Sequence, residues 1–391
     1  MRVSKQRLLG LALVGAVICA CFWLATSHSP SSATSPMSAA REYHTATLLQ
    51  DGRVLIVGGF DGEHSLASAE LYDPSTGTFT KTGSMSEARD HHTATLLSDG
   101  EVLVAGGFGN STDVVASAEL YDPHTGRFTP TGSMLEARSF HIAVPLADGR
   151  VLVTGGEGAS DAEIYDPTTG TFTQIAAETA CAWTAGVLLD DGRVLLVGCD
   201  MPDTSTRAQI FDPKTDSFTD TGPMEEPRSN ATATLLADGR VLVAGGQGEP
   251  GADVGPPLAS AELYDPATGK FSPTGSMTDA RSGHTATLLR DGRVLITSGW
   301  GNASAAMTSV ELYDPSRGQF TMIRGVYPTL IVARACNPLS LAFEFLDPMV
   351  SGRVNPTATL LNDGRVLVAG GGGVTCSYDY PSLSSAEVFT P

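Results

Sequence analysis

One phrase recurs seven times along the chain and constrains its fold more than any other feature. Each copy has a Leu-rich run, an Asp-Gly pair, a Val-Leu run and, in most copies, a glycine pair followed by Glu-Leu-Tyr-Asp-Pro. The Asp-Gly pairs begin at Asp51, Asp99, Asp148, Asp191, Asp238, Asp291 and Asp363. A period of about fifty residues with four short apolar runs per unit predicts small sheets arranged around an axis. We therefore expect an all-β protein, a seven-bladed β-propeller that occupies residues 30–391 as one closed domain.

The acidic composition limits the class of partner. The formal net charge is −19 over 391 residues. A surface of this sign repels phosphate backbones, so we expect no nucleic-acid partner. The same charge favours solubility. We also expect the protein to be a monomer.

Residues 1–29 differ in kind from the repeats. Basic residues precede an uncharged apolar stretch at 8–25, and a Ser/Thr/Pro-rich segment follows. This order is typical of an export signal. Cys21 follows a small residue, as in a bacterial lipoprotein processing site; cleavage after Ser27 and retention as a membrane helix are the alternatives. We expect an exported protein, membrane-anchored or extracellular, that contacts the membrane only through this segment.

Residues 89–134 show how one unit would fold into four strands, called a to d below. His92–Leu97, Val102–Ala105 and Ser117–Tyr121 are the expected strands a, b and c, and Phe128 opens strand d. Between a and b we expect a type I′ turn at Asp99-Gly100, which needs positive φ at both positions. Between c and d, Pro fixes φ and Gly accepts a left-handed conformation. Four antiparallel strands then make one blade.

The glycine pair, the Tyr of strand c and an aromatic residue seven positions later resemble the kelch repeat. In this chain the aromatic residue is Phe79, Phe128, Phe172, Phe218, Phe271 and Phe320, where kelch repeats usually carry Trp. The resemblance covers nearly the whole chain after the leader and implies a propeller. It does not select a function, because kelch propellers include enzymes, peptide-binding adaptors and scaffolds.

The seventh unit stops after strand c at Phe389 and lacks its own outer strand. The segment Thr34-Ser35-Pro36-Met37 resembles the residues that follow strand d in the other units. We therefore expect residues 30–36 to supply strand d of the last blade, which removes an exposed sheet edge. Ser31 occupies the position of Phe in the other blades.

Arginine and glutamate vary together between the units. The segment before strand a carries Arg41, Arg89, Arg138, Arg228, Arg281 and Arg353, and strand c carries Glu70, Glu119, Glu163, Glu262, Glu311 and Glu387. Repeat four has Cys181 and Gln209 at these positions, and Cys199 replaces its second glycine. We expect each Arg to lie across the glycines and form a charge-assisted pair with Glu. The alternative is that each Arg faces solvent.

The cysteines after the leader suggest two disulfides. Cys181 and Cys199 fall at opposing ends of a hairpin in repeat four, where a disulfide would replace the Arg–Glu bridge. Cys336 lies in an insertion at 324–348, and Cys376 lies in the b–c connection of repeat seven. Both segments emerge on one face of the disc. Since an exported protein oxidises such cysteines, we expect the pairs Cys181–Cys199 and Cys336–Cys376.

Histidines before strand a are the first candidates for chemistry. They are His44, His92, His141 and His284. In a propeller these positions approach the mouth of the central channel, where they would converge on a metal. The alternative is a shared packing or hydrogen-bonding role, because most of them sit in one repeated phrase and lack tight ligand spacing. We favour that alternative and expect no metal and no cofactor.

Tyr43-His44, followed by Asp-Gly-Arg-Val, is similar to the segment of galactose oxidase that carries an adjacent Tyr-His pair of copper ligands. That family places the pair in a late blade, before a further domain that adds another His. Here the late segment reads Asn355-Pro356, and we expect no further domain after Pro391. The resemblance implies a copper-radical carbohydrate or alcohol oxidase as the alternative function.

Connections that differ between units are the expected binding surface, since a rigid scaffold displays them. Phe60, Phe108 and Trp300 follow the glycine-pair position at the start of b–c connections. They would anchor a peptide or a sugar, or pack on neighbouring loops. We therefore expect a non-enzymatic module that binds protein or glycan on the face formed by the b–c and d–a connections.

Overall fold

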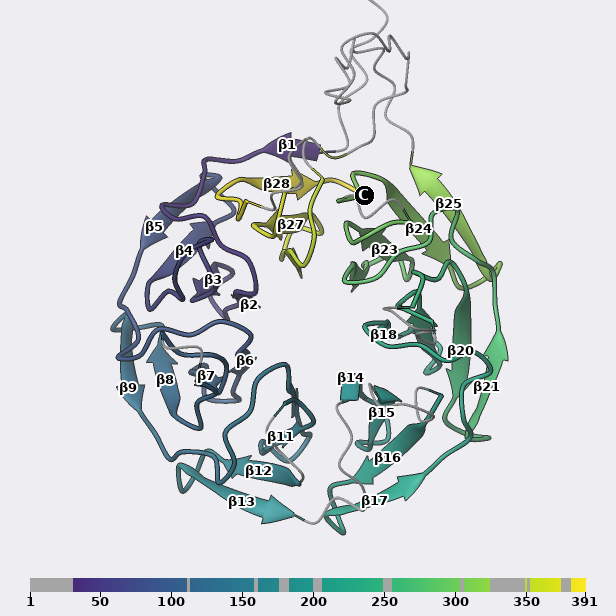
Figure 1. Cartoon of the computed structure of the whole chain (residues 1–391), viewed down its shortest axis with the longest axis horizontal. Coiled ribbons are helices and arrows are strands. Elements are labelled where there is room, and N and C mark those ends of the chain that lie inside the picture. The colour runs from purple at the N-terminus through teal and green to yellow at the C-terminus, as the bar shows by residue number, and fades with distance from the viewer. Residues whose placement is uncertain are drawn as a thin grey trace, which may run out of the picture.

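Seven four-stranded antiparallel sheets form a closed ring in the computed structural model (Figure 1). The structure describes residues 31–110, 113–157, 161–175, 183–199, 206–248, 255–302, 306–323, 349, 352–373 and 381–391. No described residue lies in a helix, and none of the described segments is a helix that would cross a membrane. The expected seven-bladed all-β propeller is confirmed.

Each blade begins at the axis and ends at the rim. The innermost strands a are β2 (Thr45–Leu48), β6 (Thr93–Leu96), β10 (Ile142–Pro145), β14 (Trp183–Leu188), β18 (Thr232–Leu235), β22 (Thr285–Leu288) and β26 (Thr357–Leu360). Strands b are β3 (Val54–Val57), β7 (Val102–Ala105), β11 (Val151–Thr154), β15 (Val194–Cys199), β19 (Val241–Ala244), β23 (Val294–Thr297) and β27 (Val366–Ala369).

The two outer strands complete each sheet. Strands c are β4 (Ala69–Asp73), β8 (Ala118–Asp122), β12 (Ala162–Asp166), β16 (Ala208–Asp212), β20 (Ala261–Asp265), β24 (Val310–Asp314) and β28 (Ala386–Phe389). Strands d are β5 (Thr78–Lys81), β9 (Arg127–Pro130), β13 (Thr171–Ile175), β17 (Ser217–Asp220), β21 (Lys270–Pro273), β25 (Gln319–Ile323) and, for blade 7, β1 (Ser31–Ala33).

The hydrophobic core lies between blades. Strand b reads as a continuous apolar run because both of its faces pack against neighbouring sheets. Leu55 and Val57 of blade 1, for example, form one cluster with Val102, Val104 and Tyr121 of blade 2. Each fully buried side chain of this kind contributes roughly 1.5–3 kcal/mol, so the blades stabilise one another rather than folding alone.

An aromatic pair joins strands c and d in six blades. Tyr72 and Phe79 are cross-strand partners in blade 1, with ring centroids 4.9 Å apart and planes tilted by 47°. Tilted rings at this distance add favourable quadrupole contact to the area they bury. In blade 7 the corresponding partners are Phe389 and Ser31, so this blade has no such pair.

The N-terminal strand closes the ring, as expected. Strand β1 pairs with β28, with Ser31 opposite Phe389 and Ala33 opposite Glu387. In Figure 1 the first strand of the chain, in purple, lies directly beside the last, in yellow. The amide of Met37 also donates to the carbonyl of Ser384, 2.8 Å away.

The a–b hairpin differs from the expected type I′ turn. In blade 2 only Gly100 has positive φ, at 94°, whereas Asp99 does not. The amide of Gly100 donates to the Leu97 carbonyl, and the amide of Glu101 donates to the Asp99 carboxylate at 3.0 Å. These contacts define a turn closed by a left-handed glycine. The prediction was wrong because the Asp side chain bonds within the turn, so that Asp does not need positive φ.

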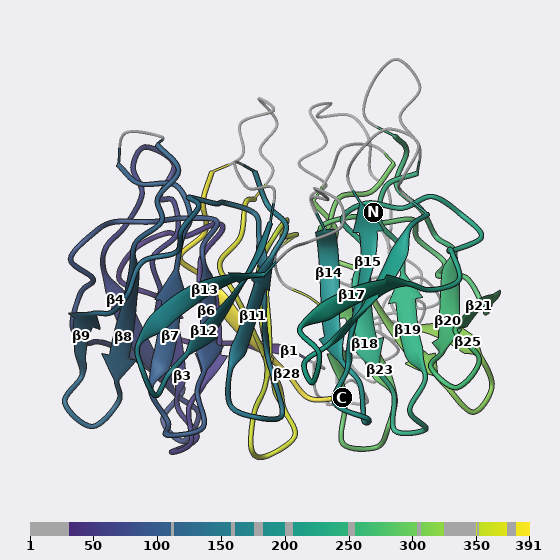
Figure 2. The same ribbon diagram turned by 90° about the horizontal axis from the view of Figure 1, so that it is seen from below.

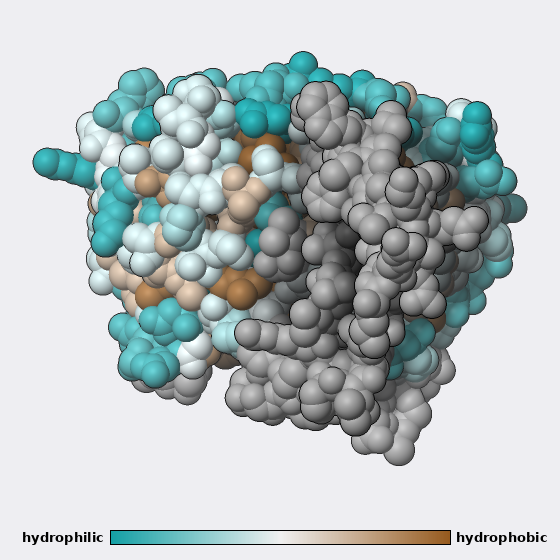
Figure 3. Space-filling view, turned by 90° about the horizontal axis from the view of Figure 1, so that it is seen from above, coloured by the Kyte–Doolittle hydropathy of each residue, from teal (hydrophilic) through white to brown (hydrophobic). Residues whose placement is uncertain are grey.

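The disc has two different faces, separated in Figure 2. The b–c connections and the d–a segments emerge together on one side, called the loop face below. The a–b hairpins and the c–d turns form the opposite turn face. The visible part of the outer rim is mostly hydrophilic or intermediate, with small apolar spots (Figure 3).

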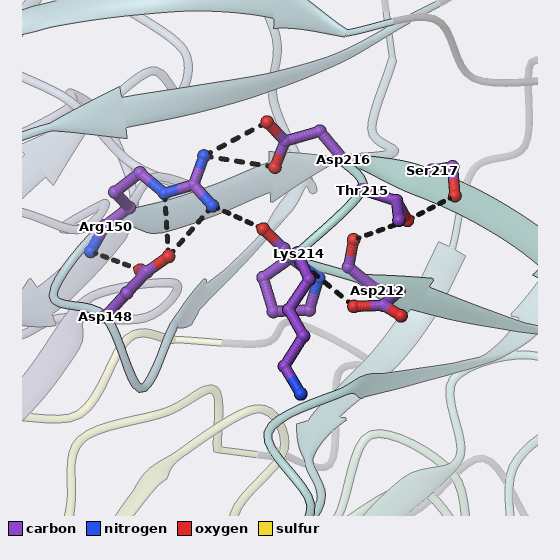
Figure 4. A network of polar contacts seen from close by, with 8 residues as sticks. Asp148, Arg150, Asp212, Lys214, Thr215, Asp216 and Ser217 are labelled. Atoms are coloured by element: carbon purple, nitrogen blue, oxygen red, sulfur yellow. Dashed lines mark hydrogen bonds and ion pairs between the residues drawn. The ribbon is translucent and has the colours of Figure 1, made fainter.

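Charged pairs on the turn face connect neighbouring blades. Arg150 of blade 3 holds Asp148 of its own hairpin and reaches Asp216 and the Pro213 carbonyl of blade 4, at 3.0 and 2.7 Å (Figure 4). Asp216 has φ 48° where the other c–d turns have glycine. The contact with Arg150 helps to hold this non-glycine residue in a left-handed conformation.

Candidate functional site

A buried arginine joins three elements in six of the seven blades. Its guanidinium meets the Glu of strand c at 2.8–3.5 Å, in the pairs Arg41–Glu70, Arg89–Glu119, Arg138–Glu163, Arg228–Glu262, Arg281–Glu311 and Arg353–Glu387. All six arginines are completely buried. The predicted bridge is confirmed, and the solvent-facing alternative is wrong. Burial lowers the pKa of Arg41, and the charge of Glu70 opposes that shift.

The glycine pair serves a purpose that the sequence did not reveal. Arg41 donates to the Gly58 carbonyl at 2.7 Å, so the first glycine supplies an acceptor for the guanidinium. A Cβ on Gly58 would lie 2.5 Å from the Arg89 carbonyl and 2.7 Å from the His92 ring, both in the next blade. The absence of a side chain at this position therefore allows the neighbouring blade to approach closely.

In blade 4 other side chains take the place of the Arg–Glu pair. Gln209 in strand c donates to the Asp220 carboxylate at 2.9 Å, and Arg207 pairs with the same carboxylate at 2.8 Å. Cys181, Cys336, Cys376 and Cys21, together with the insertion at 324–348, lie outside the described residues, as does the side chain of Cys199. Both disulfides and the lipidation of Cys21 therefore stay predictions.

The four histidines connect innermost strands. Each ring Nε2 forms a hydrogen bond of 2.9–3.1 Å with a Thr hydroxyl of the preceding blade. The pairs are His92–Thr45, His141–Thr93, His284–Thr232 and His44–Thr357. All four rings are buried. In blade 7 Pro356 takes the place of His, and Thr285 of blade 6 turns to Thr297 at 2.7 Å instead. These contacts describe a shared hydrogen-bonding role.

Burial also sets the charge of these histidines. Desolvation, followed by the charges of Arg41 and Arg353, lowers the pKa of His44 to about 3. Burial likewise lowers the pKa values of His141 and His284 to about 3. The rings are therefore neutral in the folded protein at pH 7.

Tyr43 and His44 are each engaged by other side chains in this structure. The Nε2 atom of His44 is occupied by Thr357 at 3.0 Å, and the Tyr43 ring stacks on His91. Among the described residues, no group of three or more His, Cys, Asp or Glu side chains is arranged to hold a metal ion.

The residue before each of these histidine positions has an unusual backbone. Tyr43, His91, Phe140, Asn230, Gly283 and Asn355 all have φ between 48° and 57°. Glycine and asparagine tolerate this left-handed region, whereas Tyr, His and Phe are strained there. The His91 amide donates to the Tyr43 carbonyl at 3.1 Å and the Phe140 amide to the His91 carbonyl at 3.2 Å, from blade to blade.

The three strained residues form an aromatic group on blades 1–3, together with Phe108; we call Tyr43, His91, Phe108 and Phe140 the aromatic arc. The imidazole of His91 lies between Tyr43, 3.7 Å away between centroids, and Phe140, 4.0 Å away. Phe108 meets Phe140 edge to face at 5.9 Å. Phe140 keeps half of its surface exposed (50%), so the arc ends in a partly exposed aromatic side chain.

Two acidic residues, Asp90 and Glu42, directly precede the arc residues His91 and Tyr43 in the sequence. Asp90 Oδ1 lies 2.5 Å from His91 Nδ1, and its Oδ2 accepts from the Ser65 hydroxyl at 2.6 Å. Burial raises the pKa of Glu42, the corresponding residue in blade 1. Burial, followed by the charge of Glu42, also raises the pKa of Tyr43. Asp90 thus fixes the plane of the His91 ring against Tyr43 and Phe140.

The predicted anchors are less exposed than expected, and they lie in blades 1, 2 and 6. Phe60, Phe108 and Trp300 are half-buried, and each backbone bridges the d–a segment on one side and its own b–c connection on the other. Only Phe108 joins the arc. A binding role for these three side chains stays a prediction.

The b–c connection of blade 3 has no aromatic residue at the position of Phe60 and Phe108. This connection, residues 155–161, is shorter than those of blade 1 (58–68) and blade 2 (106–117). At the position of Phe60 and Phe108, blade 3 carries Glu157, which is exposed and pairs through its backbone with Ser139. The residue before Phe140 is therefore paired through its backbone with an exposed acidic residue.

Sequence reasoning missed Phe140, His91 and Asp90 as members of one group. A signal was present: the position before the histidines holds Asn or Gly in blades 5, 6 and 7, which indicates a left-handed backbone, but aromatic residues in blades 1, 2 and 3. Bulky residues at a strained position are a reason to suspect function.

On the turn face, the described residues form open clefts between blades that are lined by paired charges. One cleft of about 740 Å³ is lined by residues that include Asp51, Arg53, Asp363 and Arg365. These charges already neutralise each other, since Arg53 meets Asp51 and Arg365 meets Asp363 at 2.6 Å. Because the same pair recurs in other blades, it belongs to the scaffold.

Comparison with known proteins identifies the repeat. A family model for the kelch motif matches residues 43–86 and 227–278. No curated protein sequence matches the chain. Among solved structures, a copper-bound fungal alcohol oxidase of the AA5 family superposes with a TM-score of 0.69 at 18% identity, covering 92% of this chain and 76% of that one. The structure of YjhT superposes with a TM-score of 0.59 at 17% identity, covering 74% and 99%. At these identities the likeness concerns the fold.

Proposed function

Since the chain is a kelch-repeat β-propeller, we propose that it is a non-enzymatic recognition module that binds a protein or a glycan through its loop face. A propeller of this kind is a rigid scaffold, and its variable connections are the parts free to take up binding. The aromatic arc is the part of the loop face best suited to that task.

One observation carries this proposal: Phe140 is half exposed although its backbone is strained. A bulky residue at φ 54° costs stability, and an exposed ring recovers little of that cost by burial. Blades 5 and 7 use Asn at the same position, with φ 50° and 48°. A strained, exposed aromatic residue in blade 3 is better explained by an external ligand than by packing.

Export places the module outside the cytoplasm in this proposal. The charged head, apolar middle and polar exit of residues 1–29 support it. Three forms stay possible: lipid on Cys21, cleavage after Ser27, and retention of the apolar stretch as a membrane helix. Mass spectrometry of the purified protein distinguishes them.

The copper oxidase is the competing function, suggested by the Tyr43-His44 sequence and by the AA5 structural neighbour. The contacts of His44 with Thr357 and of Tyr43 with His91 weigh against it. Elemental analysis separates the two functions: stoichiometric copper that is lost in His44→Ala would overturn the proposal. The recognition module would be supported by a protein or glycan that binds the original protein and the Phe60→Asn variant but does not bind the Phe140→Asn variant.

A further inference from the structure

Charge is distributed unequally between the two faces of the disc. Within the described b–c and d–a segments, all arginines and lysines except Arg207 belong to the six buried Arg–Glu pairs. Arg207 is itself paired with Asp220 at 2.8 Å. The same segments carry the carboxylates Glu42, Asp61, Glu63, Glu87, Asp90, Asp113, Glu136, Glu157, Asp161, Glu225, Glu226 and Asp279.

The excess is smaller on the turn face, although its c–d turns carry aspartates such as Asp73 and Asp122. There a partly exposed arginine neutralises the hairpin aspartate in six blades, as in Arg240–Asp238 and Arg293–Asp291, both at 2.6 Å. The described part of the loop face therefore carries much of the net charge of −19. A surface of this sign attracts cationic partners and repels anionic ones.

The open end of the aromatic arc provides a specific position for a cation. Phe140 is half exposed, and the exposed Glu157 pairs through its backbone with Ser139, the residue before Phe140. A guanidinium or ammonium group placed over an aromatic face and beside a carboxylate gains both cation–π and Coulomb attraction. Neighbouring acidic groups such as Glu136 and Asp161 extend this field along blade 3.

We propose that Phe140 and Glu157 form a subsite for a Lys or Arg side chain of a basic peptide segment, which lies across the acidic loop face. This inference rests on the proposed recognition function and narrows it to a protein partner of positive charge. Phe140 supplies the ring face, Glu157 the carboxylate, and His91 and Tyr43 hold Phe140 in position from behind.

Isothermal titration calorimetry of the full-length protein tests this inference, with hexaarginine as the probe and hexaglutamate and cellohexaose as comparison ligands. Hexaarginine is expected to bind, with an affinity that falls as salt is added. Phe140→Leu keeps an apolar side chain but removes the ring, and is expected to weaken binding about threefold to fivefold. Glu157→Gln is expected to weaken it to a similar degree.

Glu101→Gln is the matched control, because it removes one negative charge from the turn face of blade 2. It is expected to leave the affinity for hexaarginine unchanged, and the thermal unfolding of each variant verifies its fold. The inference is overturned if hexaarginine does not bind, if Phe140→Leu has no effect, or if Glu101→Gln and Glu157→Gln weaken binding equally.

The comparison ligands separate this inference from the proposed function. Binding of cellohexaose that depends on Phe140, without binding of hexaarginine, overturns the cationic subsite and leaves the recognition module standing. Stoichiometric copper that depends on His44 overturns the recognition module itself.

Discussion

The guanidinium of Arg138 and the carboxylate of Glu163 meet at 2.8 Å inside blade 3, and neither side chain has any exposed surface. Arg138 also donates to the Asp161 carbonyl at 2.9 Å, and Glu163 accepts from the amide of Leu135 at 2.7 Å. The pair thus ties strand c and the b–c connection to the segment that leads into strand a. Its equivalents recur in five other blades, so the scaffold depends on buried charges that must remain partnered.

Removing one member of this pair is expected to destabilise the protein strongly. Arg138→Met leaves the Glu163 carboxylate buried without its cation, at a cost of about 3–5 kcal/mol in the free energy of unfolding. Urea denaturation measures this change. The exposed pair Arg293–Asp291 is the control, and Arg293→Met is expected to cost no more than about 1 kcal/mol. Equal effects of the two substitutions would show that the buried pair has no special role.

The N-terminal strand is expected to be needed for thermal stability. A chain that begins at residue 37 lacks β1 and leaves β28 as an unpaired edge, so its melting temperature should fall well below that of the full-length protein. A chain that begins at residue 30 keeps β1 and is expected to melt close to the full-length protein. Calorimetry of both truncated forms tests this expectation, and two equal melting temperatures would contradict it.

The scaffold was predictable from the sequence because its information is repeated. Each copy of the phrase reports the same strand, turn and bridge, so the Arg–Glu pairs emerged from their joint absence in repeat four. Even the N-terminal strand followed from the similarity of Thr34–Met37 to internal segments. Repetition averages out local ambiguity but does not reveal how a side chain bonds. The type of the a–b turn was therefore predicted wrongly although Asp-Gly recurs in all seven copies, because the Asp carboxylate accepts a hydrogen bond within the turn.

The aromatic arc was not predictable in the same way, because it depends on what differs between the copies. Tyr43, His91 and Phe140 lie about fifty residues apart in sequence, at the repeat period, and come together only when adjacent blades pack. Sequence reasoning placed interest on His44 and its equivalents instead. Those rings turn toward the threonines of neighbouring strands, which could not be known before the register of the innermost strands was fixed.

Neutral buried histidines are expected to make the protein sensitive to acid. The pKa of His284 is lowered from 6.5 to about 3 in the folded state, so below pH 6.5 the unfolded chain binds a proton that the folded protein does not. Stability is therefore lost as pH falls from about 6.5 towards 3, at up to about 1.4 kcal/mol per pH unit for each such histidine.

His284→Ala tests this relation, because blade 5 already carries Ala231 at the same position. The variant is expected to reduce the slope of unfolding free energy against pH between pH 6 and 4, measured by urea denaturation at several pH values. His124 is 92% exposed, and His124→Ala should leave the slope unchanged. An unaltered slope in His284→Ala would mean that this ring is protonated in the folded protein.

Phe140 is expected to contribute little to folding, in contrast to a buried Phe of the same blade. Phe140→Asn places at φ 54° a residue type that blades 5 and 7 use there, so relief of backbone strain offsets the lost contact with His91. The free energy of unfolding should stay within about 1 kcal/mol of the original value. Phe172→Asn removes a buried ring that packs on Tyr165 and should cost about 3 kcal/mol or more. Urea denaturation compares the two variants. If both lost stability equally, Phe140 would be a packing residue, and the strain at its backbone would have no connection with binding.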